Sequence, residues 1–178
     1  MTKLHVSVLL LAILPTNQIH AAGAPDALKG KSVILSWSET RQQRHVGEPS
    51  FYPYNASVSL NVYISTAGRV FSRRITSTRA GAGTIERAPG GSAGQGKALF
   101  AGQTMTLIGV TIGGAYRTSV EFDASFTSCN ARVVLAFQSG RTSITLSPIS
   151  KRYLEIKSTS VNGMSCSIRA GNVLAGAT

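Results

Sequence analysis

The chain has 178 residues with a formal net charge of +11, and its length suits a single domain that buries a real core. Two of its 3 His, His5 and His20, lie in the first 23 residues, and its 2 Cys suit a disulfide, so the rest of the chain has too few ligands for a zinc site. We expect no metal and no cofactor.

The first 23 residues have the order of a secretory signal peptide. Lys3 gives a positive start, residues 6–14 ("VSVLLLAIL") are apolar, and small residues follow in "HAAGAP". The apolar run is too short to span a bilayer, which takes about 20 residues. We expect cleavage near Gly23, because the alternative after Ala24 would put Pro25 next to the scissile bond. The mature chain 24–178 then keeps a charge of +10, has no transmembrane segment, and is periplasmic or extracellular.

The mature region alternates apolar and polar residues with a period of two, which indicates strands that are buried on one face. In "SVSLNVYIS", for example, Val58, Leu60, Val62 and Ile64 share one face. We predict strands at 31–43, 57–65, 69–77, 97–101, 104–112, 115–123, 129–137 and 141–146, and a final hairpin of 152–159 with 165–170.

Short turns separate these segments, at 65–69, 112–115, 138–141 and 161–164. Asn162-Gly163 is the strongest hairpin signal, because a type I′ turn needs positive φ at both central residues. Residues 78–96 hold six Gly and one Pro, and we predict a flexible loop there. The pattern predicts an all-β antiparallel meander of about 8–10 strands. It forms a closed or nearly closed up-and-down barrel or, alternatively, a β-sandwich.

Two cysteines in an exported chain, Cys129 and Cys166, point to one disulfide between the 129–137 strand and the last strand.

Four segments, "LKGKSVILSWSETRQQR", "GRVFSRR", "SCNARV" and "SCSIRAGN", are similar to those of a family of small exported bacterial proteins of uncharacterised function. The resemblance covers most of the mature chain. It implies no catalytic residue, cofactor or substrate.

Arginine supplies most of the basic charge, and its planar guanidinium suits bidentate capture of phosphate or carboxylate. If the first three strands are neighbours, six arginines can form one cationic rim. These candidate anion-binding residues are Arg41, Arg44, Arg69, Arg73, Arg74 and Arg79. Export argues for an anionic envelope polymer, lipid head groups or an acidic protein as partner, and against nucleic acid.

Catalytic patterns are weak, and we expect no catalytic residue. His45 is the only His of the mature chain, and nothing in the sequence brings a Ser to it. Two carboxylate pairs, Glu121 with Asp123 and Glu39 with Glu155, have uninformative spacing. The segment 91–97 spells G-x-x-x-x-G-K, but it lacks the strand before it, the helix after it and the final Ser or Thr of a phosphate-binding loop.

The sequence therefore favours an exported, non-catalytic binding protein that docks an Arg-rich face on anionic envelope components or acidic proteins. The alternatives are a carrier of a small apolar ligand in a barrel cavity and a hydrolase that uses His45 or a carboxylate pair.

Overall fold

The computed structural model describes residues 23–87, 97–138 and 140–174. The predicted signal peptide, apart from Gly23, lies outside these residues, as does the part of the Gly-rich segment from 88 to 96.

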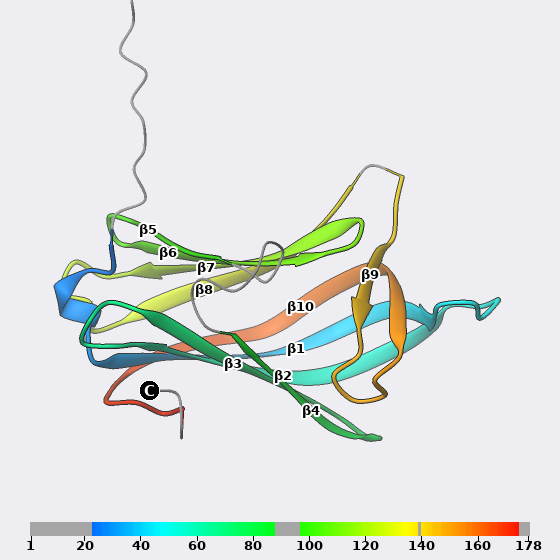
Figure 1. Cartoon of the computed structure of the whole chain (residues 1–178), viewed down its shortest axis with the longest axis horizontal. Helices are drawn as coiled ribbons and strands as arrows, with labels where there is room; N and C mark the ends of the chain where they lie inside the picture. The colour runs from blue at the N-terminus through cyan, green and yellow to red at the C-terminus, as the bar shows by residue number, and fades with distance from the viewer. Residues whose placement is uncertain (1–22, 88–96, 139, 175–178) are drawn as a thin grey trace, which may run out of the picture.

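Ten strands follow a short 3-10 helix, η1 (Asp26–Leu28), in the described chain. They form two antiparallel sheets (Figure 1). The six-stranded sheet runs in the order β4 (Gly81–Arg87), β3 (Val70–Thr78), β2 (Tyr52–Ile64), β1 (Lys31–His45), β10 (Tyr153–Ala170) and β9 (Ser143–Leu146). The four-stranded sheet runs in the order β5 (Lys97–Ala101), β6 (Thr104–Thr111), β7 (Gly114–Phe122) and β8 (Cys129–Phe137). The all-β antiparallel prediction is confirmed, and both a barrel and a sandwich describe the arrangement.

The six-stranded sheet is strongly curled, so that its opposite edges approach each other. A Cβ atom on Gly83 of β4 would lie 2.5 Å from the carbonyl carbon of Pro148, which follows β9. At the other side, an isolated bridge between Ile112 and Ile144 ties the turn after β6 to β9. The first contact nearly closes the six-stranded sheet on itself, and the second joins it to the four-stranded sheet. We call the two joined sheets the shell.

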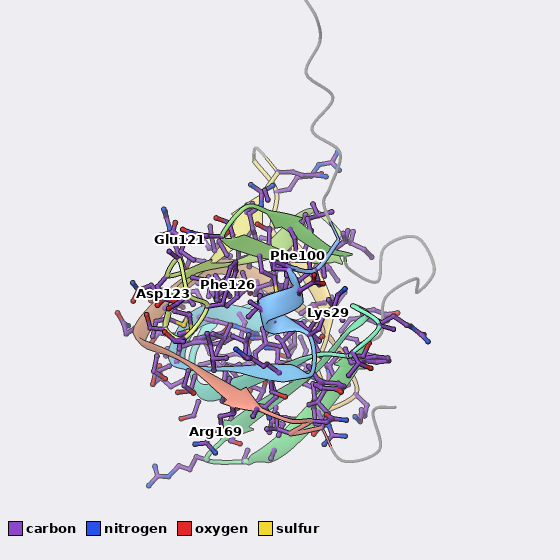
Figure 2. All side chains as sticks on the ribbon, turned by 90° about the vertical axis from the view of Figure 1, so that its left-hand side faces the viewer. Lys29, Phe100, Glu121, Asp123, Phe126 and Arg169 are labelled. Atoms are coloured by element: carbon purple, nitrogen blue, oxygen red, sulfur yellow. A yellow bond between two sulfur atoms is a disulfide. The ribbon has the colours of Figure 1, made fainter. Side chains whose placement is uncertain are left out.

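One apolar core joins the two sheets. Alternate residues of β1 and β2 point inward from the six-stranded sheet, and Met105, Val120 and Phe122 point inward from the other. Leu28 of η1 is completely buried against this core, and the helix lies across the end of the shell between the sheets (Figure 2). The apolar core therefore occupies the end of the molecule nearest η1.

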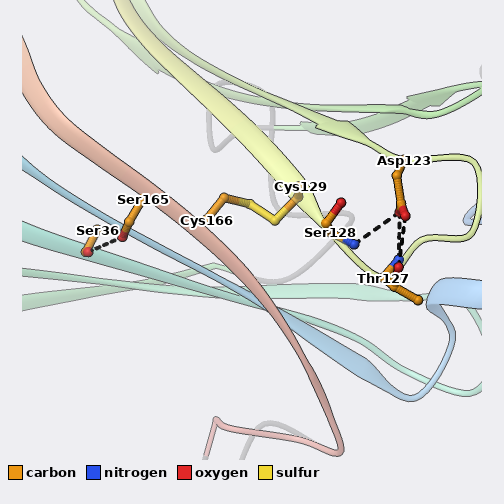
Figure 3. Close-up of a disulfide and its surroundings, with 7 residues drawn as sticks. All are labelled: Ser36, Asp123, Thr127, Ser128, Cys129, Ser165 and Cys166. Carbon is orange, nitrogen blue, oxygen red and sulfur yellow. Dashed lines mark hydrogen bonds between the residues drawn. A yellow bond between two sulfur atoms is a disulfide. The ribbon is translucent and has the colours of Figure 1, made fainter.

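The predicted disulfide is confirmed. Cys129, the first residue of β8, is bonded to Cys166 of β10, with 5.6 Å between the two Cα atoms (Figure 3). The loop before Cys129 is organised by Asp123, whose Oδ1 accepts hydrogen bonds from the backbone N–H of Thr127 (2.7 Å) and Ser128 (3.1 Å). The bond thus connects one sheet to the other.

Two sequence predictions about local structure are wrong. Residues 81–87, predicted as part of a loop, form β4, which pairs with β3. The predicted last hairpin is one long strand, β10, because Gly163 uses its positive φ of 63° in a β-bulge instead of a turn. There, the register against β1 shifts between Ser36 and Ser38, as expected where an extra residue is accommodated.

Candidate functional site

The inward face of β1 changes from apolar to polar halfway along the strand. Its first half buries Val33, Leu35 and Trp37, and the same alternation then buries Glu39, Arg41 and Gln43. Charged side chains are rarely buried unless they are paired. The half of the shell farther from η1 therefore buries charged and polar side chains beside apolar ones such as Ile156, the partner of Gln43 in β10.

Glu39 lies at the centre of this interior and is paired on both carboxylate oxygens. Oε1 accepts hydrogen bonds from Trp37 Nε1 at 2.9 Å and from an Arg74 terminal amine at 2.6 Å. Oε2 accepts one from a terminal amine of Arg41. Burial alone would raise the pKa of Glu39, but the Arg74 and Arg41 guanidiniums outweigh it and hold the pKa below its ordinary value. The carboxylate is thus ionised and shared by two cations.

Tyr116 of β7 covers both guanidiniums from the opposite sheet. Its ring centroid lies 5.0 Å from Arg74 Cζ and 5.6 Å from Arg41 Cζ, within the range of cation–π attraction. Arg74 also lies 5.7 Å from the Trp37 ring. We call Glu39, Arg41, Arg74, Tyr116 and Trp37 the interior arginine cluster.

The six predicted anion-binding arginines are not on one face. Arg41 and Arg74 converge inside the shell, whereas strand alternation puts Arg73 on the outer face of β3. Of the rest, Arg44 pairs with Glu155 at 2.6 Å, Arg69 lies over the Phe71 ring, and Arg79 is exposed in the turn after β3. Of the six, Arg41 and Arg74 share one partner, Glu39, and nothing in the sequence had set these two apart from the others.

A second site lies at the end of the molecule opposite η1. Four large apolar side chains are exposed there: Val46 (51%), Ile112 (67%), Leu146 (48%) and Tyr153 (58%). Together with Ile144 they form what we call the tip patch. Hydrogen bonds hold its elements together, from Val46 N to Tyr153 O (3.0 Å) and between Ile112 and Ile144. An open cavity of about 480 Å³ lies among Val46, Ile112, Ile144, Arg152 and Tyr153.

Three basic residues lie next to residues of the tip patch. Arg152 lines the cavity, Lys151 precedes it in the turn before β10, and Arg141 packs close to Gly113, next to Ile112. The nearby acids are paired, Glu48 with Arg152 at 3.5 Å and Glu155 with Arg44. The tip therefore combines exposed apolar surface with excess positive charge.

His45 is not alone on the surface. Its Nδ1 lies 3.2 Å from Glu48 Oε1, and its Nε2 lies 3.3 Å from Ser150 Oγ. The Glu48 carboxylate also accepts a hydrogen bond from the His45 backbone N–H at 3.1 Å. A Ser–His–carboxylate order like this is the arrangement that activates a serine nucleophile. Sequence spacing alone had not indicated Ser150.

The sequence left two carboxylate pairs open as candidates for a hydrolase, and the structure separates one of them. Glu39 points into the shell, while Glu155 lies on the outer face and is bonded to Arg44 and Thr142. The Asp123 carboxylate accepts hydrogen bonds from residues of the loop that follows it. The Ser125 hydroxyl, and after it the backbone N–H groups of Ser128 and Thr127, keep the pKa of Asp123 well below the usual range. Glu121, on the strand before it, is exposed (Figure 2). Glu39 and Glu155 therefore do not form a pair, because they lie on opposite faces of the six-stranded sheet.

Sequence reasoning missed the roles of Glu39, Gln43 and Tyr116. A signal existed: Glu39, Arg41 and Gln43 continue the phase set by Val33, Leu35 and Trp37. A polar residue in that phase on a strand that is buried on one face must itself be buried.

No protein-family model, curated protein or solved structure matches the chain. Within the described residues, no helix has the length and apolar character needed to cross a membrane.

Proposed function

We propose that the protein is an exported binding protein that docks its tip patch on an anionic membrane surface. The observation that supports this function is the exposed apolar surface of Val46, Ile112, Leu146 and Tyr153 beside Arg141, Lys151 and Arg152. Exposed apolar patches with a polar rim mark interaction sites. Apolar side chains enter the interfacial region of a bilayer while cations pair with anionic head groups. An exposed Tyr also suits the membrane–water interface.

The tip patch favours a lipid surface over an acidic protein or a wall polymer. Its residues come from the turns before β2, β7 and β10 and from the adjoining strands. Backbone hydrogen bonds hold these turns and strands next to one another, so they can contact one surface together. A wall polymer offers charge but little apolar material, so it would leave the exposed Ile112 and Val46 side chains in water.

Vesicle sedimentation tests this function with protein purified after export, so that the form the cell produces is measured. We expect binding to vesicles of phosphatidylglycerol mixed with phosphatidylcholine, and weaker binding as salt rises, because exposed charges are screened over about 8–10 Å at physiological ionic strength. Replacing Ile112 with Ser should weaken binding about tenfold, since burying an Ile side chain contributes about 1.5–3 kcal/mol.

Leu99→Ser is the matched control. Leu99 is 37% exposed on β5, outside the tip patch, so its loss should leave vesicle binding unchanged. Equal binding to neutral vesicles, no effect of salt, or equal weakening by the two substitutions would each contradict membrane docking. Membrane docking would also be contradicted if the protein bound no vesicles but bound cell-wall polymer or an acidic protein, and if the Ile112→Ser variant kept that binding.

A hydrolase is the second candidate, and the contacts of His45 favour it. With its proton on Nδ1, directed at Glu48, the ring would accept the Ser150 hydroxyl proton at Nε2, and the neighbouring cavity would hold an apolar acyl group. Labelling by a fluorophosphonate probe that is lost in Ser150→Ala would support this activity. Absence of labelling, together with no hydrolysis of p-nitrophenyl butyrate above the Ser150→Ala level, would exclude it.

A further inference from the structure

Buried polar atoms without a hydrogen-bond partner gather at one place in the described part of the chain. They are Arg41 Nε, Arg74 Nε, Gln43 Oε1, Tyr116 Oη and Thr159 Oγ1. Thr159 pairs with Arg41 in the register of β10 against β1, and Gln43 follows Arg41 on the same face. All five atoms thus belong to the interior arginine cluster or its immediate neighbours.

Such a concentration is unfavourable in a merely structural cluster. A buried polar group left unsatisfied costs about 1–3 kcal/mol, and more when it is charged. Native proteins satisfy the large majority of their buried polar atoms. The unsatisfied donors belong to Arg41 of β1, Arg74 of β3 and Tyr116 of β7. Such a group of donors is typical of a site that completes its hydrogen bonds with a ligand.

The charge of the cluster selects the kind of ligand. Two guanidiniums share the single carboxylate of Glu39, which leaves one positive charge uncompensated within the cluster. One ligand oxyanion with a single negative charge would balance it. A guanidinium N–H and a phenol O–H both donate to oxygen, and charge-assisted bonds of this kind are the strong ones.

We propose that Arg41, Arg74 and Tyr116 form a binding site for a singly charged oxyanion group, either a carboxylate or a phosphodiester. Arg74 is the solvent-side member, with 19% of its side chain exposed against 7% for Arg41. The ligand group passes Arg74 and accepts hydrogen bonds from the Nε–H groups and the Tyr116 hydroxyl. This site is separate from the tip patch and does not depend on membrane docking.

The chain contains a reporter for the site, because Trp37 is its single Trp. Its indole N–H donates to Glu39 and its ring lies next to Arg74. Titration with acetate, dimethyl phosphate, inorganic phosphate or chloride at constant ionic strength should change Trp37 emission. We expect saturation with acetate or dimethyl phosphate and no saturation with chloride. Whichever of acetate and dimethyl phosphate has the lower Kd identifies the ligand class, carboxylate or phosphodiester. Inorganic phosphate should bind no more tightly than that anion.

Two variants with opposite effects separate a ligand site from a structural cluster. Tyr116→Phe removes only the unpartnered hydroxyl, so it should not lower thermal stability, whereas it should weaken anion binding about tenfold. Glu39→Gln raises the charge of the site and should tighten binding about tenfold or more. The matched controls are Tyr63→Phe, on the outer face of β2, and Glu121→Gln, on the other sheet. Neither control should weaken or tighten anion binding.

The proposal is overturned if no oxyanion gives a saturable change in Trp37 emission. It is also overturned if Tyr116→Phe binds acetate and dimethyl phosphate as the unmodified chain does. Should Glu39→Gln fail to fold, the Tyr116→Phe comparison still decides. Tighter binding in Glu121→Gln equal to that in Glu39→Gln would show that overall charge alone is responsible, and would likewise overturn it.

Discussion

Removal of the Cys129–Cys166 bond should destabilise the protein strongly, because the bond restricts a long segment and joins the two sheets. The bonded residues are 37 positions apart. In the chain-entropy description, closing a loop of that length contributes about 4 kcal/mol at 25 °C. No hydrogen-bonded ladder joins β8 to β10 among the described strands, so backbone pairing does not replace the lost connection.

Urea unfolding of the Cys129→Ser/Cys166→Ser double variant measures this contribution. With an m-value of about 2 kcal/mol/M, a loss of about 4 kcal/mol lowers the unfolding midpoint by about 2 M. Ser165→Ala is the control. Its hydroxyl makes an exposed contact of 2.6 Å with Ser36 beside the bond, and we expect a loss below about 1 kcal/mol. A shift under about 0.5 M in the double variant, with an unchanged m-value, would refute the reasoning.

Three further predictions concern stability. Because the folded protein lowers the pKa of Glu39, this carboxylate stabilises the fold fully at pH values above its unfolded pKa near 4.5, and the contribution is lost as pH falls through the folded pKa. Urea unfolding between pH 7 and pH 3 should show this loss of stability, and Glu39→Gln should reduce the dependence of stability on pH. Gly83→Ala should destabilise by about 1–3 kcal/mol in thermal unfolding, because its Cβ would meet backbone atoms of Pro148 at 2.5 Å, whereas Gly163→Ala should cost only the αL penalty of about 1–2 kcal/mol. Ser32→Ala should lose about 1–3 kcal/mol in urea unfolding, since its buried hydroxyl donates to Gly171 O at 2.7 Å and accepts from Val173 N at 3.2 Å.

Strand alternation predicted most of the fold because it depends only on which residues can face a core. The 97–101 and 129–137 strands begin and end where predicted. β4 was missed because "GAGTIER" contains one large apolar residue, Ile85, and its pairing with β3 is a tertiary effect. The composition of residues 81–87 does not indicate that β3 will pair with them.

The Asn162-Gly163 pair shows a different limit. A Gly with positive φ serves a hairpin turn and a β-bulge equally well. Which of the two forms depends on the partner strand. β1 runs for fifteen residues, so it pairs with residues on both sides of Gly163 and keeps β10 continuous. A second register shift between Gln42 and Gln43 follows along the same ladder. Two bulges bend β10 so that it can leave the disulfide near β8 and still reach the tip patch.

The candidate sites were predictable to the extent that they follow from strand phase. Val33, Leu35 and Trp37 fix the phase of β1, because a slip by one residue would expose all three. That phase necessarily places Glu39, Arg41 and Gln43 in the interior. Replacing a buried ion pair by apolar residues is often neutral or stabilising, so stability alone does not explain why β1 carries polar residues there. A ligand explains both their burial and the donors left without partners. The tip patch follows no such rule: its residues come from four separate elements, and only the folded chain brings them together.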